Sequence, residues 1–526
     1  MDTTDTAPAT APRLSLLTVI ETEPDATVQD TLRSVTRQTS GDWQWIVAVP
    51  PASSWAAPFA DLAAQDRRVV VVETGDDPLN AALAAASGEF VGVVFVGDRL
   101  AREATRYVLE AADKGDDPVD VLYTDHEWIS AEGDRHDRDL KPDWSPERLR
   151  HHHYIGQLAV FRRDLVTRVG GFRPELQGAV HHDLALRVTE RADRVVHVRR
   201  VLYLVRDRDL SAAPWALEHP FEESAAVRAV QEHLDRVGVR ATAAPGAAGG
   251  LVDVRREPDR TTSVSIIMPT IGTKEVVGGV MRTMVTETIR SVAQRSRHQD
   301  VEYVVVYDKP TPDDVLDELR GLRDELGLRL KLVVFTAAFN FSAKCNYGAG
   351  FADGEVLVFL NDDMEAISED LVESLIAPLA EEGVGATGPK LRFEDGRIQS
   401  GGTQFGSGAI RNRYRLAEAD DPGVSAELLV SRETSGVTGA CLAVRKTVFE
   451  EVGGFAESFP MNYNDVDFAL KMLRHGLRLL WLHDIELFHF ESVTRDRTVH
   501  PWELKRLAHR WGDRKVVKER YASGVR

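Results

Sequence analysis

One pattern occurs twice along this chain and restricts its fold more than any other feature. The segment LSLLTVIET (Leu14–Thr22) is repeated as VSIIMPTIG (Val264–Gly272). The segment VGGFRPELQGAVHHDLALR (Val169–Arg187) is repeated as VGGFAESFPMNYNDVDFALK (Val452–Lys471). Because the paired segments keep the same order, the chain carries one unit of roughly 200 residues twice. Its 526 residues also exceed what a single hydrophobic core usually serves.

In both units, short apolar runs alternate with helical patterns. Runs such as WQWIVAVP and VEYVVVYD are typical of buried parallel strands, and their alternation with helices predicts an α/β fold with a mostly parallel, Rossmann-like sheet. The Ala/Gly/Pro stretch Ala241–Gly250 suits a linker. We predict a disordered tail at 1–13, a first domain at 14–210, a helix and linker at 211–260, a second domain at 261–495 and a helical segment at 496–526.

The composition excludes several classes of function. The chain has 64 basic and 83 acidic residues, and its net charge of -19 repels nucleic acid. The two cysteines form neither a zinc pattern nor a disulfide framework, which favours a reducing compartment. The N-terminus lacks a secretory signal, and no stretch reaches the roughly 18 consecutive apolar residues of a membrane helix. We therefore expect a soluble cytoplasmic protein.

Three polar motifs in the second unit carry candidate chemistry. A strand pattern runs into Asn361-Asp362-Asp363, and carboxylates at the carboxyl end of a strand can hold a divalent cation. Asp465 begins a helical pattern and can accept a proton, and His489 can complete a Mn²⁺ or Mg²⁺ site as a neutral imidazole. Taken alone, the three motifs have simpler interpretations: an acidic turn, a helix cap and a packed histidine, respectively.

Together and in this order, the motifs resemble those of the GT-A-fold glycosyltransferases of family 2. More closely, the chain is similar to bacterial enzymes with two tandem family-2 domains that act in cell-surface polysaccharide pathways. The resemblance spans about Leu14 to Trp511 and is carried by VSIIMPT, the strand ending at Asp308, FNFSAKCNYGAGFADGEVLVFLNDD, TSGVTGACLAVRKTVFEEVGGF, NDVDFALKMLRHG and LFHFES. It implies two GT-A-like domains in tandem, followed by C-terminal helices.

The resemblance implies roles for residues of the second unit. Asp465 matches the catalytic base, and Asp363 and His489 match residues that hold a Mg²⁺ or Mn²⁺ cofactor. The implied donor-binding residues are Pro269, Thr270, Asp308, Asn340, Ser342, Asn346 and Asp362, and the implied acceptor-side residues are Thr438, Gly439 and Asn464. The turn VYDKP departs from the family's usual pattern, so the nucleobase does not follow from it. Asn340, Ser342 and Thr438 have the alternative of satisfying loop backbone groups.

The first unit lacks most of these chemical groups. After its fourth apolar run, only Asp98 stands where the family carries several acids, and His181 occupies the position of the base. We therefore expect a non-catalytic partner domain, because one acid holds Mg²⁺ poorly. A site that uses His181 as base is the alternative. For the run His151-His152-His153, solvation or packing is favoured over metal binding, since adjacent histidines do not share a face in regular structure.

The implied reaction is the inverting, metal-dependent transfer of a sugar from a nucleotide-diphosphate sugar to a hydroxyl of a glycan or lipid-linked glycan. A non-catalytic carbohydrate-binding or scaffold protein derived from transferase domains is the main alternative, and it fits the first unit better than the second. A nucleotidyltransferase is disfavoured, because neither unit begins with a Gly-rich, basic triphosphate loop. The basic C-terminal segment has two further implications: it can contact the inner face of the cell membrane, or, as is more frequent, it can pack on its own domain or on a second subunit of a homo-oligomer.

Overall fold

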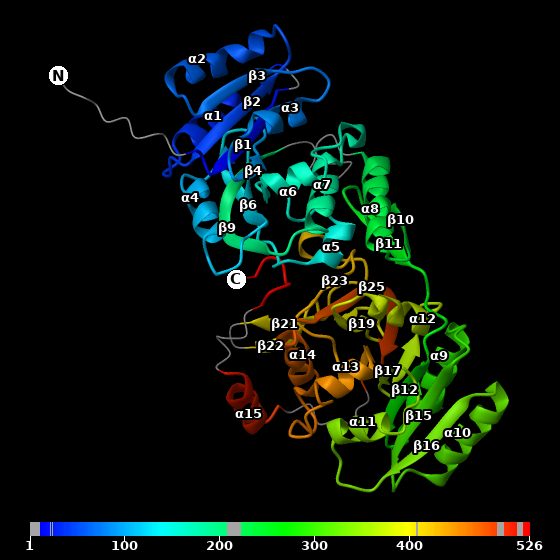
Figure 1. Ribbon diagram of the computed structural model, residues 1–526. Helices are drawn as coiled ribbons and strands as arrows, with labels where there is room; N and C mark the ends of the chain where they lie inside the picture. The colour runs from blue at the N-terminus through cyan, green and yellow to red at the C-terminus, as the bar shows by residue number, and fades with distance from the viewer. Residues whose placement is uncertain are drawn as a thin grey trace. The chain divides into compact units, whose positions relative to one another are not determined.

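The computed structural model describes residues 11–20, 23, 25–207, 222–406, 409–491, 499–512 and 519–525. The chain forms two compact units. The first comprises Met1–Gly238, Ala243–Val254 and Ser523–Arg526, and the second comprises Val239–Thr242 and Arg255–Ala522. Figure 1 labels the helices and strands of both units.

The first unit is built on a nine-stranded mixed sheet. Its strand order is β3-β2-β1-β4-β8-β6-β9-β5, and β7 pairs with β6. The strands are β1 Leu14–Val19, β2 Trp43–Val49, β3 Val69–Glu73, β4 Phe90–Val93, β5 Arg99–Leu100, β6 Val121–Ile129, β7 Arg135–Asp139, β8 Val160–Arg162 and β9 Val195–Arg206. The helices are α1 Val28–Thr36, α2 Ala57–Gln65, α3 Pro78–Ala85, α4 Ala104–Ala112, α5 Pro146–His151, α6 Arg163–Arg168, α7 Val180–Thr189 and α8 Glu223–Val237, with short 3₁₀ helices η1 Ser54–Ala56 and η2 Pro174–Leu176.

The second unit is built on a ten-stranded mixed sheet of order β16-β15-β12-β17-β24-β19-β25-β18, and β20 and β23 pair with β19 and β25. Its strands are β12 Val264–Thr270, β13 Lys274–Val277, β14 Val280–Thr283, β15 Val301–Asp308, β16 Arg329–Phe335, β17 Val356–Leu360, β18 Met364–Ala366, β19 Val384–Arg392, β20 Ile398–Ser400, β21 Thr403–Gly406, β22 Ala409–Asn412, β23 Arg432–Glu433, β24 Cys441–Arg445 and β25 Arg478–His489. Its helices are α9 Met284–Arg295, α10 Asp313–Leu326, α11 Phe341–Ala349, α12 Leu371–Ile376, α13 Lys446–Glu451, α14 Asn464–Arg474 and α15 Pro501–Trp511, with η3 Ala377–Ala380 and η4 Val424–Ala426.

The two sheets have the same plan. Strands β3, β2, β1, β4, β8, β6, β9 and β5 of the first unit correspond in order to β16, β15, β12, β17, β24, β19, β25 and β18 of the second. In each unit the first strand lies between two parallel neighbours, β2 and β4 or β15 and β17. The repeat in the sequence is therefore a repeat of the fold, and the predicted α/β class is confirmed.

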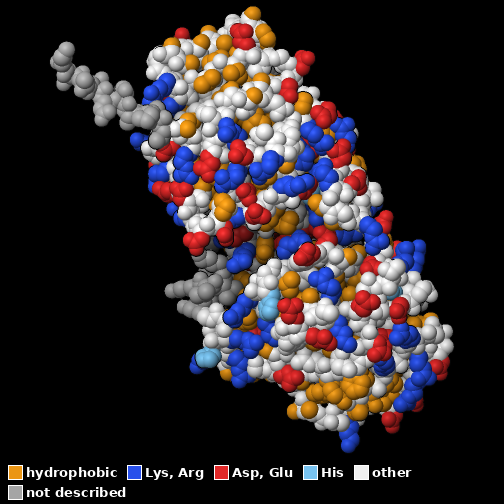
Figure 2. Space-filling model, in the orientation of Figure 1, with side chains coloured by type: hydrophobic (Ala, Val, Ile, Leu, Met, Phe, Trp, Pro, Cys, Tyr) orange, Lys and Arg blue, Asp and Glu red, His pale blue; other side chains and the backbone are white. Residues whose placement is uncertain are grey.

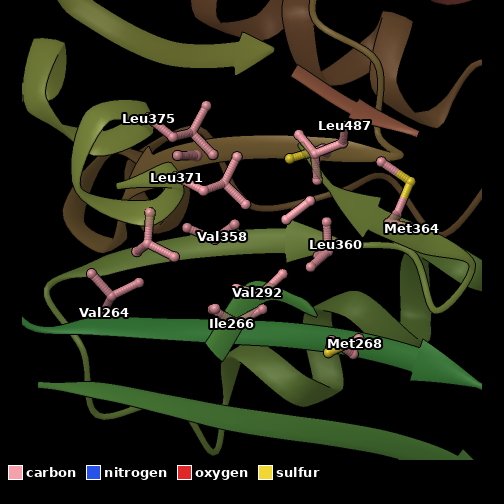
Figure 3. Packing of buried hydrophobic residues seen from close by; sticks show 14 of the residues in the cluster. Val264, Ile266, Met268, Val292, Val358, Leu360, Met364, Leu371, Leu375 and Leu487 are labelled. Carbon is pink, nitrogen blue, oxygen red and sulfur yellow. The ribbon is translucent and has the colours of Figure 1, made fainter. Parts of the chain in front are cut away.

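Strand β12 positions the carboxyl edge of the second sheet. Its alternate residues face two separate cores. Val264, Ile266 and Met268 pack with α9, α10 and α12, and Figure 3 shows them with Val292 of α9 and Leu371 of α12. Ile267 packs with α11, α13 and α14. Because helices cover both faces, polar groups of the sheet are accessible mainly at the strand ends. The neighbouring parallel strands β12, β15 and β17 end at Thr270, Asp308 and Leu360.

The predicted linker differs from the structure. Residues Ala241–Pro245 form β10, which pairs with β11 Val252–Arg256 in a two-stranded sheet. The backbone N–H of Ala243 also donates to Gln231 Oε1 on α8, at 2.9 Å. Local composition alone favoured a linker here, whereas a partner strand and a helix side chain supply the hydrogen bonds that order the segment.

The C-terminal segment contains one of the predicted amphipathic helices. In α15, Leu507 is buried with Val466 and Leu470 of α14, and the Nε groups of Arg510 and Trp511 each donate to Asp467 Oδ1 at 2.8 Å. Residues 496–498, 513–518 and 526 of the predicted helical segment and residues 1–10 of the predicted tail lie outside the described residues.

On the face drawn in Figure 2, basic and acidic side chains are interspersed. Within the described part of the chain, no helix has both the length and the apolar character needed to cross a bilayer.

Gly354 gives a test of how tightly β12 is packed. A Cβ on Gly354 would lie 2.6 Å from the backbone nitrogen of Ser265. We expect Gly354→Ala to lower the free energy of unfolding of the second unit by about 1–3 kcal/mol, because backbone cannot yield as a side chain can. Gly321, in the exposed interior of α10, has nothing within 4 Å of the same position. Gly321→Ala should therefore raise stability by up to about 1 kcal/mol in the same denaturant titration, and equal effects of the two changes would contradict the packing described.

Candidate active site

Two consecutive aspartates follow β17 at the carboxyl edge of the second sheet. Asp362 Oδ2 accepts a hydrogen bond from Thr270 Oγ1 at 2.6 Å, which joins it to the end of β12. The Thr288 hydroxyl on α9 donates to the backbone carbonyl of Asp362 at 2.9 Å. Burial and the adjacent Asp363 raise the pKa of Asp362 from 3.8 to about 7. This edge therefore holds more acidic charge than its surroundings stabilise, which is the electrostatic condition that attracts a cation.

His489 reaches these acids through the register of two antiparallel strands. Strand β18 pairs with β25 so that Met364 lies opposite His489. The imidazole Nε2 lies 3.2 Å from Asp363 Oδ1. On the other side of the ring, Nδ1 lies 2.6 Å from Gln399 Oε1, whose amide nitrogen contacts the His489 carbonyl at 3.3 Å. Because an amide oxygen only accepts, Nδ1 carries the proton and Nε2 is directed toward Asp363.

The donor set fits a hard divalent cation held partly by its substrate. Within the described residues, no group of three or more His, Cys, Asp or Glu side chains could hold a metal ion. Asp363 and His489 would supply two protein ligands, and Gln399 orients the imidazole as a hydrogen-bond partner usually does at a metal site. Mg²⁺ and Mn²⁺ accept such sites, because one or two protein ligands are completed by phosphate oxygens and water.

Lys344 is a site residue that the sequence analysis missed. This lysine on α11 is buried, and its Nζ donates to the Thr270 carbonyl at 2.8 Å and to Asp308 Oδ2 at 3.0 Å. Burial lowers the pKa of Lys344, and the Asp308 carboxylate opposes that change. The sequence signal that could have indicated it is a lysine beside Cys345 on the face of the helix where the other residues are small. Lys344 joins the ends of β12 and β15, where Asp308 was predicted to contact the donor.

Three predicted donor-binding residues face another part of the chain. Asn340 Nδ2 donates to the Glu457 carbonyl, the buried Ser342 hydroxyl donates to the Phe459 carbonyl at 2.7 Å, and Asn346 forms hydrogen bonds with both backbone groups of Phe455. The alternative interpretation of Asn340 and Ser342 therefore describes their contacts: they satisfy loop backbone. The reason is that α11 packs beside the segment that leads into α14, and this contact could not be read from local sequence. The predicted Pro269 is likewise a buried residue within β12.

The remaining predicted residues surround the start of α14. Asp465 Oδ2 accepts from the backbone N–H of Gly439 at 3.1 Å, and Asp465 Oδ1 accepts from Val466 N at 2.8 Å. Asn464 is buried and its Oδ1 accepts from the Asp465 N–H at 2.7 Å. The Thr438 hydroxyl accepts from Ala440 N at 3.3 Å, so this side chain satisfies loop backbone.

A backbone contact joins the Asp465 end of the site to the acidic end. The Asn361 N–H donates to the Ala440 carbonyl at 2.9 Å, one residue from Gly439, which binds Asp465. The Asn361 side-chain amide lies 3.3 Å from His489 Nε2. Asp363, His489 and Asp465 therefore belong to one continuous set of contacts and are not scattered over separate surfaces.

The equivalent edge of the first unit contains different groups. Asp98 is buried, and its carboxylate accepts from the Tyr203 hydroxyl and from Arg206 N, each at 2.9 Å. Strand β5 pairs with β9 so that Arg99, the residue after Asp98, lies opposite Leu204. By register, Leu204 takes the place that His489 has in the second unit.

The candidate base of the first unit sits in an apolar environment. The His181 ring packs against Phe95 and Phe172 with centroid separations of 5.2 and 5.9 Å. Burial lowers the pKa of His181 from 6.5 to about 4, which makes its imidazole a weak base at neutral pH. It borders a mainly apolar cavity of about 30 Å³, room for about one water molecule.

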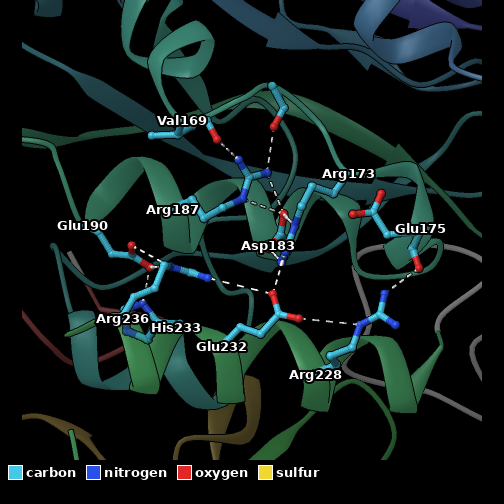
Figure 4. A network of polar contacts seen from close by, with 11 residues as sticks. Val169, Arg173, Glu175, Asp183, Arg187, Glu190, Arg228, Glu232, His233 and Arg236 are labelled. Carbon is cyan, nitrogen blue, oxygen red and sulfur yellow. Dashed lines mark hydrogen bonds and ion pairs between the residues drawn. The ribbon is translucent and has the colours of Figure 1, made fainter. Parts of the chain in front are cut away.

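The other polar groups of this region are structural. Asp183, which follows His181 and His182 on α7, is buried and paired with Arg173 and Arg187; Figure 4 shows the network around it. The run His151–His153 is buried rather than solvated: His151 Nδ1 contacts the Val252 carbonyl at 3.0 Å, and the His153 ring stacks on His182. Packing, one of the two roles expected for this run, is what the structure shows.

Comparison with known proteins gives a family match within the second unit. Residues 265–453 match the model described as glycosyl transferase family 2. The O-antigen biosynthesis protein RfbC of Myxococcus xanthus is 31% identical over 92% of this chain, and the uncharacterized protein y4gI of Sinorhizobium fredii is 30% identical over 94%. The chain spans only 38% and 55% of those two relatives.

Similarity to solved structures is weaker. GalNAc-T7 with UDP, GalNAc and Mn²⁺ gives a TM-score of 0.39 at 14% identity, covering 51% of each chain. The mannosyltransferase PcManGT of Pyrobaculum calidifontis gives 0.34 at 19% identity, covering 49% of this chain and 64% of that one. Both TM-scores are below 0.5, too low to support an argument from these structures.

The raised pKa of Asp362 predicts a pH dependence of stability. The folded-state value of about 7 exceeds the ordinary value of 3.8, so the folded protein binds this proton more tightly than the unfolded chain and loses stability as pH rises between these values. In metal-free buffer, wild-type stability should fall relative to Asp362→Asn between pH 4 and 8, by at most about 4 kcal/mol. Thermal unfolding at several pH values measures this difference, and parallel profiles of the two proteins would contradict it.

Proposed function

We propose, from the premise that residues 265–453 belong to glycosyl transferase family 2, that the second unit transfers a sugar. The donor would be a nucleotide-diphosphate sugar and the acceptor a hydroxyl of a glycan or lipid-linked glycan in cell-surface polysaccharide synthesis. The observation that carries this proposal is the continuous set of contacts between Asp465 and the Asp363–His489 pair at one sheet edge. The proposed base and the proposed cation ligands are thus linked through Gly439, Ala440 and Asn361.

Asp465 is proposed as the base that deprotonates the acceptor hydroxyl. Its two oxygens are held by the N–H groups of Gly439 and Val466, so the carboxylate keeps one orientation before substrate binds. A Cβ on Gly439 would lie 3.4 Å from Asp465 Cβ, an ordinary contact distance, so the contribution of Gly439 to the base is its backbone N–H. Transfer by a single displacement would invert the anomeric carbon.

The donor is proposed to lie along the ends of β12, β15 and β17. Asp308 can accept from a nucleoside hydroxyl or base N–H, and Lys344 holds its carboxylate in place. Asp363 and His489 would hold Mg²⁺ or Mn²⁺, which when bound neutralises charge on the diphosphate. Thr270 fixes the neighbouring Asp362.

The first unit is proposed to be a non-catalytic partner. Its strand-end acid is engaged by Tyr203 and Arg206, and Leu204 replaces the imidazole. The alternative of a carbohydrate-binding or scaffold protein describes this unit better than the second, where the acids and His489 meet. We place the chain at the cytoplasmic side of the cell membrane, where nucleotide sugars and lipid-linked acceptors are both available.

The role of Asp465 is testable by an isosteric change. Asp465→Asn should lower sugar transfer by about 100-fold or more, since it removes the proton acceptor. Donor binding should be retained, because Asp308 and Asp363 lie elsewhere along the edge. Transfer to a glycan acceptor and calorimetric titration with a nucleoside diphosphate would separate the two effects.

The matched controls lie in the first unit. His181 and Asp98 occupy the equivalent places there. The changes His181→Ala and Asp98→Asn should leave transfer nearly unchanged in folded protein. If a folded His181→Ala protein had no turnover, the chemistry would belong to the first unit and this assignment would be wrong.

Metal dependence is the second test of the site. EDTA should abolish transfer, and Mg²⁺ or Mn²⁺ should restore it. Independently of activity, Mn²⁺ binding measured by electron paramagnetic resonance with a nucleoside diphosphate present should weaken about 10–100-fold in Gln399→Leu, because the imidazole loses the partner that orients it. Full turnover in chelator, or unaltered Mn²⁺ affinity in Asp363→Asn, would remove the cation from the proposal.

A further inference from the structure

A short hairpin in the second unit carries a group of strongly exposed apolar side chains. Strands β13 and β14 carry Met281, Val276 and Val280, which are 63%, 61% and 59% exposed. Among the described residues these are the three most exposed large hydrophobic side chains. Isolated exposed apolar residues are common, but three within one hairpin mark a contact surface.

The hairpin is built as a self-contained projection. Its strands pair antiparallel from Lys274 opposite Thr283 to Val277 opposite Val280, and the turn residues Gly278 and Gly279 have φ of +59° and +81°. Two positive φ angles are those of the tight turn that suits a two-residue hairpin loop, and glycine adopts them without strain. Much of the backbone of this projection is hydrogen-bonded internally, which is a requirement for entering a medium of low polarity.

The charged residues of the hairpin, Lys274, Glu275 and Arg282, are at its base, and the two cations are paired with the body of the unit. Lys274 Nζ lies 2.8 Å from Asp314 Oδ2 and 3.3 Å from Glu318 Oε1 on α10. Arg282 Nη1 lies 3.2 Å from Glu365 Oε2 on β18. The four residues from Val277 to Val280 carry no charge. The tip is thus apolar, and the base is held by ion pairs.

The position of the hairpin connects it to the proposed active site. It follows β12, which ends at Thr270, and the Met284 N–H at the start of α9 closes its base on the Thr273 carbonyl at 3.0 Å. Its Arg282 contacts Glu365, two residues after Asp363. The hairpin therefore stands beside the edge where the donor and the cation are proposed to bind.

We propose that the β13–β14 hairpin is a bilayer-contact element that places its apolar tip into the surface of the membrane carrying the acceptor. This inference rests on the proposed function, because only a lipid-linked acceptor requires the site to approach a membrane. With a net charge of -19 on the chain and the hairpin's own cations paired, the contact is apolar, and a neutral lipid surface suffices. Three side chains give the weak, reversible binding of a single short anchor.

A second copy of the chain fits the hairpin less well as its partner. It would need roughly 800 Å² on each partner for a stable interface, far more than three side chains supply.

A larger apolar patch gathers near α11, as Figure 2 shows, where Phe339, Tyr347 and Phe351 are 51%, 42% and 43% exposed. That patch consists of aromatic rings on a helix and its flanking loop rather than a projecting tip, and it serves as the control.

The test is flotation of the full chain with phosphatidylcholine vesicles. Wild-type protein should float in part and remain bound at about 0.5 M NaCl, because the contact is apolar and salt screens only charges. The double variant Val276→Ser, Met281→Ser should reduce the floated fraction at least about fivefold, since two of the three apolar contacts are lost. The matched variant Tyr347→Ser, Phe351→Ser should float as the wild type does.

Other results would overturn the proposal. These are the absence of flotation by the wild type, loss of flotation in the α11 variant instead of the hairpin variant, or binding only to anionic vesicles that salt reverses. A dimeric mass for the wild type in solution and a monomeric mass for the hairpin variant would assign the surface to a second copy.

Transfer to a water-soluble acceptor should be unchanged in the hairpin variant. Absence of transfer by the wild type would refute the proposed function, while the flotation result would still decide the hairpin.

Discussion

The antiparallel pairing of β18 with β25 is the contact on which the proposed site depends. It sets Met364 opposite His489 and brings the imidazole Nε2 within 3.2 Å of Asp363. A slip of one residue would turn His489 to the other face of the sheet, because side chains alternate along a strand. Gln399 of β20, at the edge of the same sheet, then accepts a hydrogen bond from Nδ1 on the opposite side of the ring. The geometry of the cation site is therefore a consequence of strand register.

The same edge explains why a cation is favoured there. Parallel strands bring Asp308, Asp362 and Asp363 to one side of the sheet, and burial, together with the adjacent Asp363, raises the pKa of Asp362. Lys344 makes its ion pair with Asp308, and its charge also acts on Asp362 without cancelling the rise of that pKa. A divalent ion at Asp363 is the proposed complement for the acidic charge that remains.

The sequence predicted the frame and the strand-end acids, because both depend on short patterns. Repeated apolar runs indicated the two α/β units, and the LNDD turn indicated Asp362 and Asp363. What it did not reveal depends on contacts between distant segments. Asn340, Ser342 and Asn346 bind the backbone before α14, and the importance of Lys344 and Gln399 follows only from the three-dimensional neighbours of Asp308 and His489. The Ala/Gly/Pro stretch became β10 for the same reason: its partner strand lies outside it.

Comparison of the two units separates the requirements of folding from those of chemistry. Both keep the strand order, and both bury an aspartate two residues after the candidate base, Asp183 or Asp467, among cationic partners. These shared features support the frame. At the strand ends the units diverge: Asp98 is engaged by Tyr203, whereas Asp363 faces an imidazole. Because the strand order is kept while the groups at the strand ends differ, a unit can have this fold without the arrangement of Asp363 and His489.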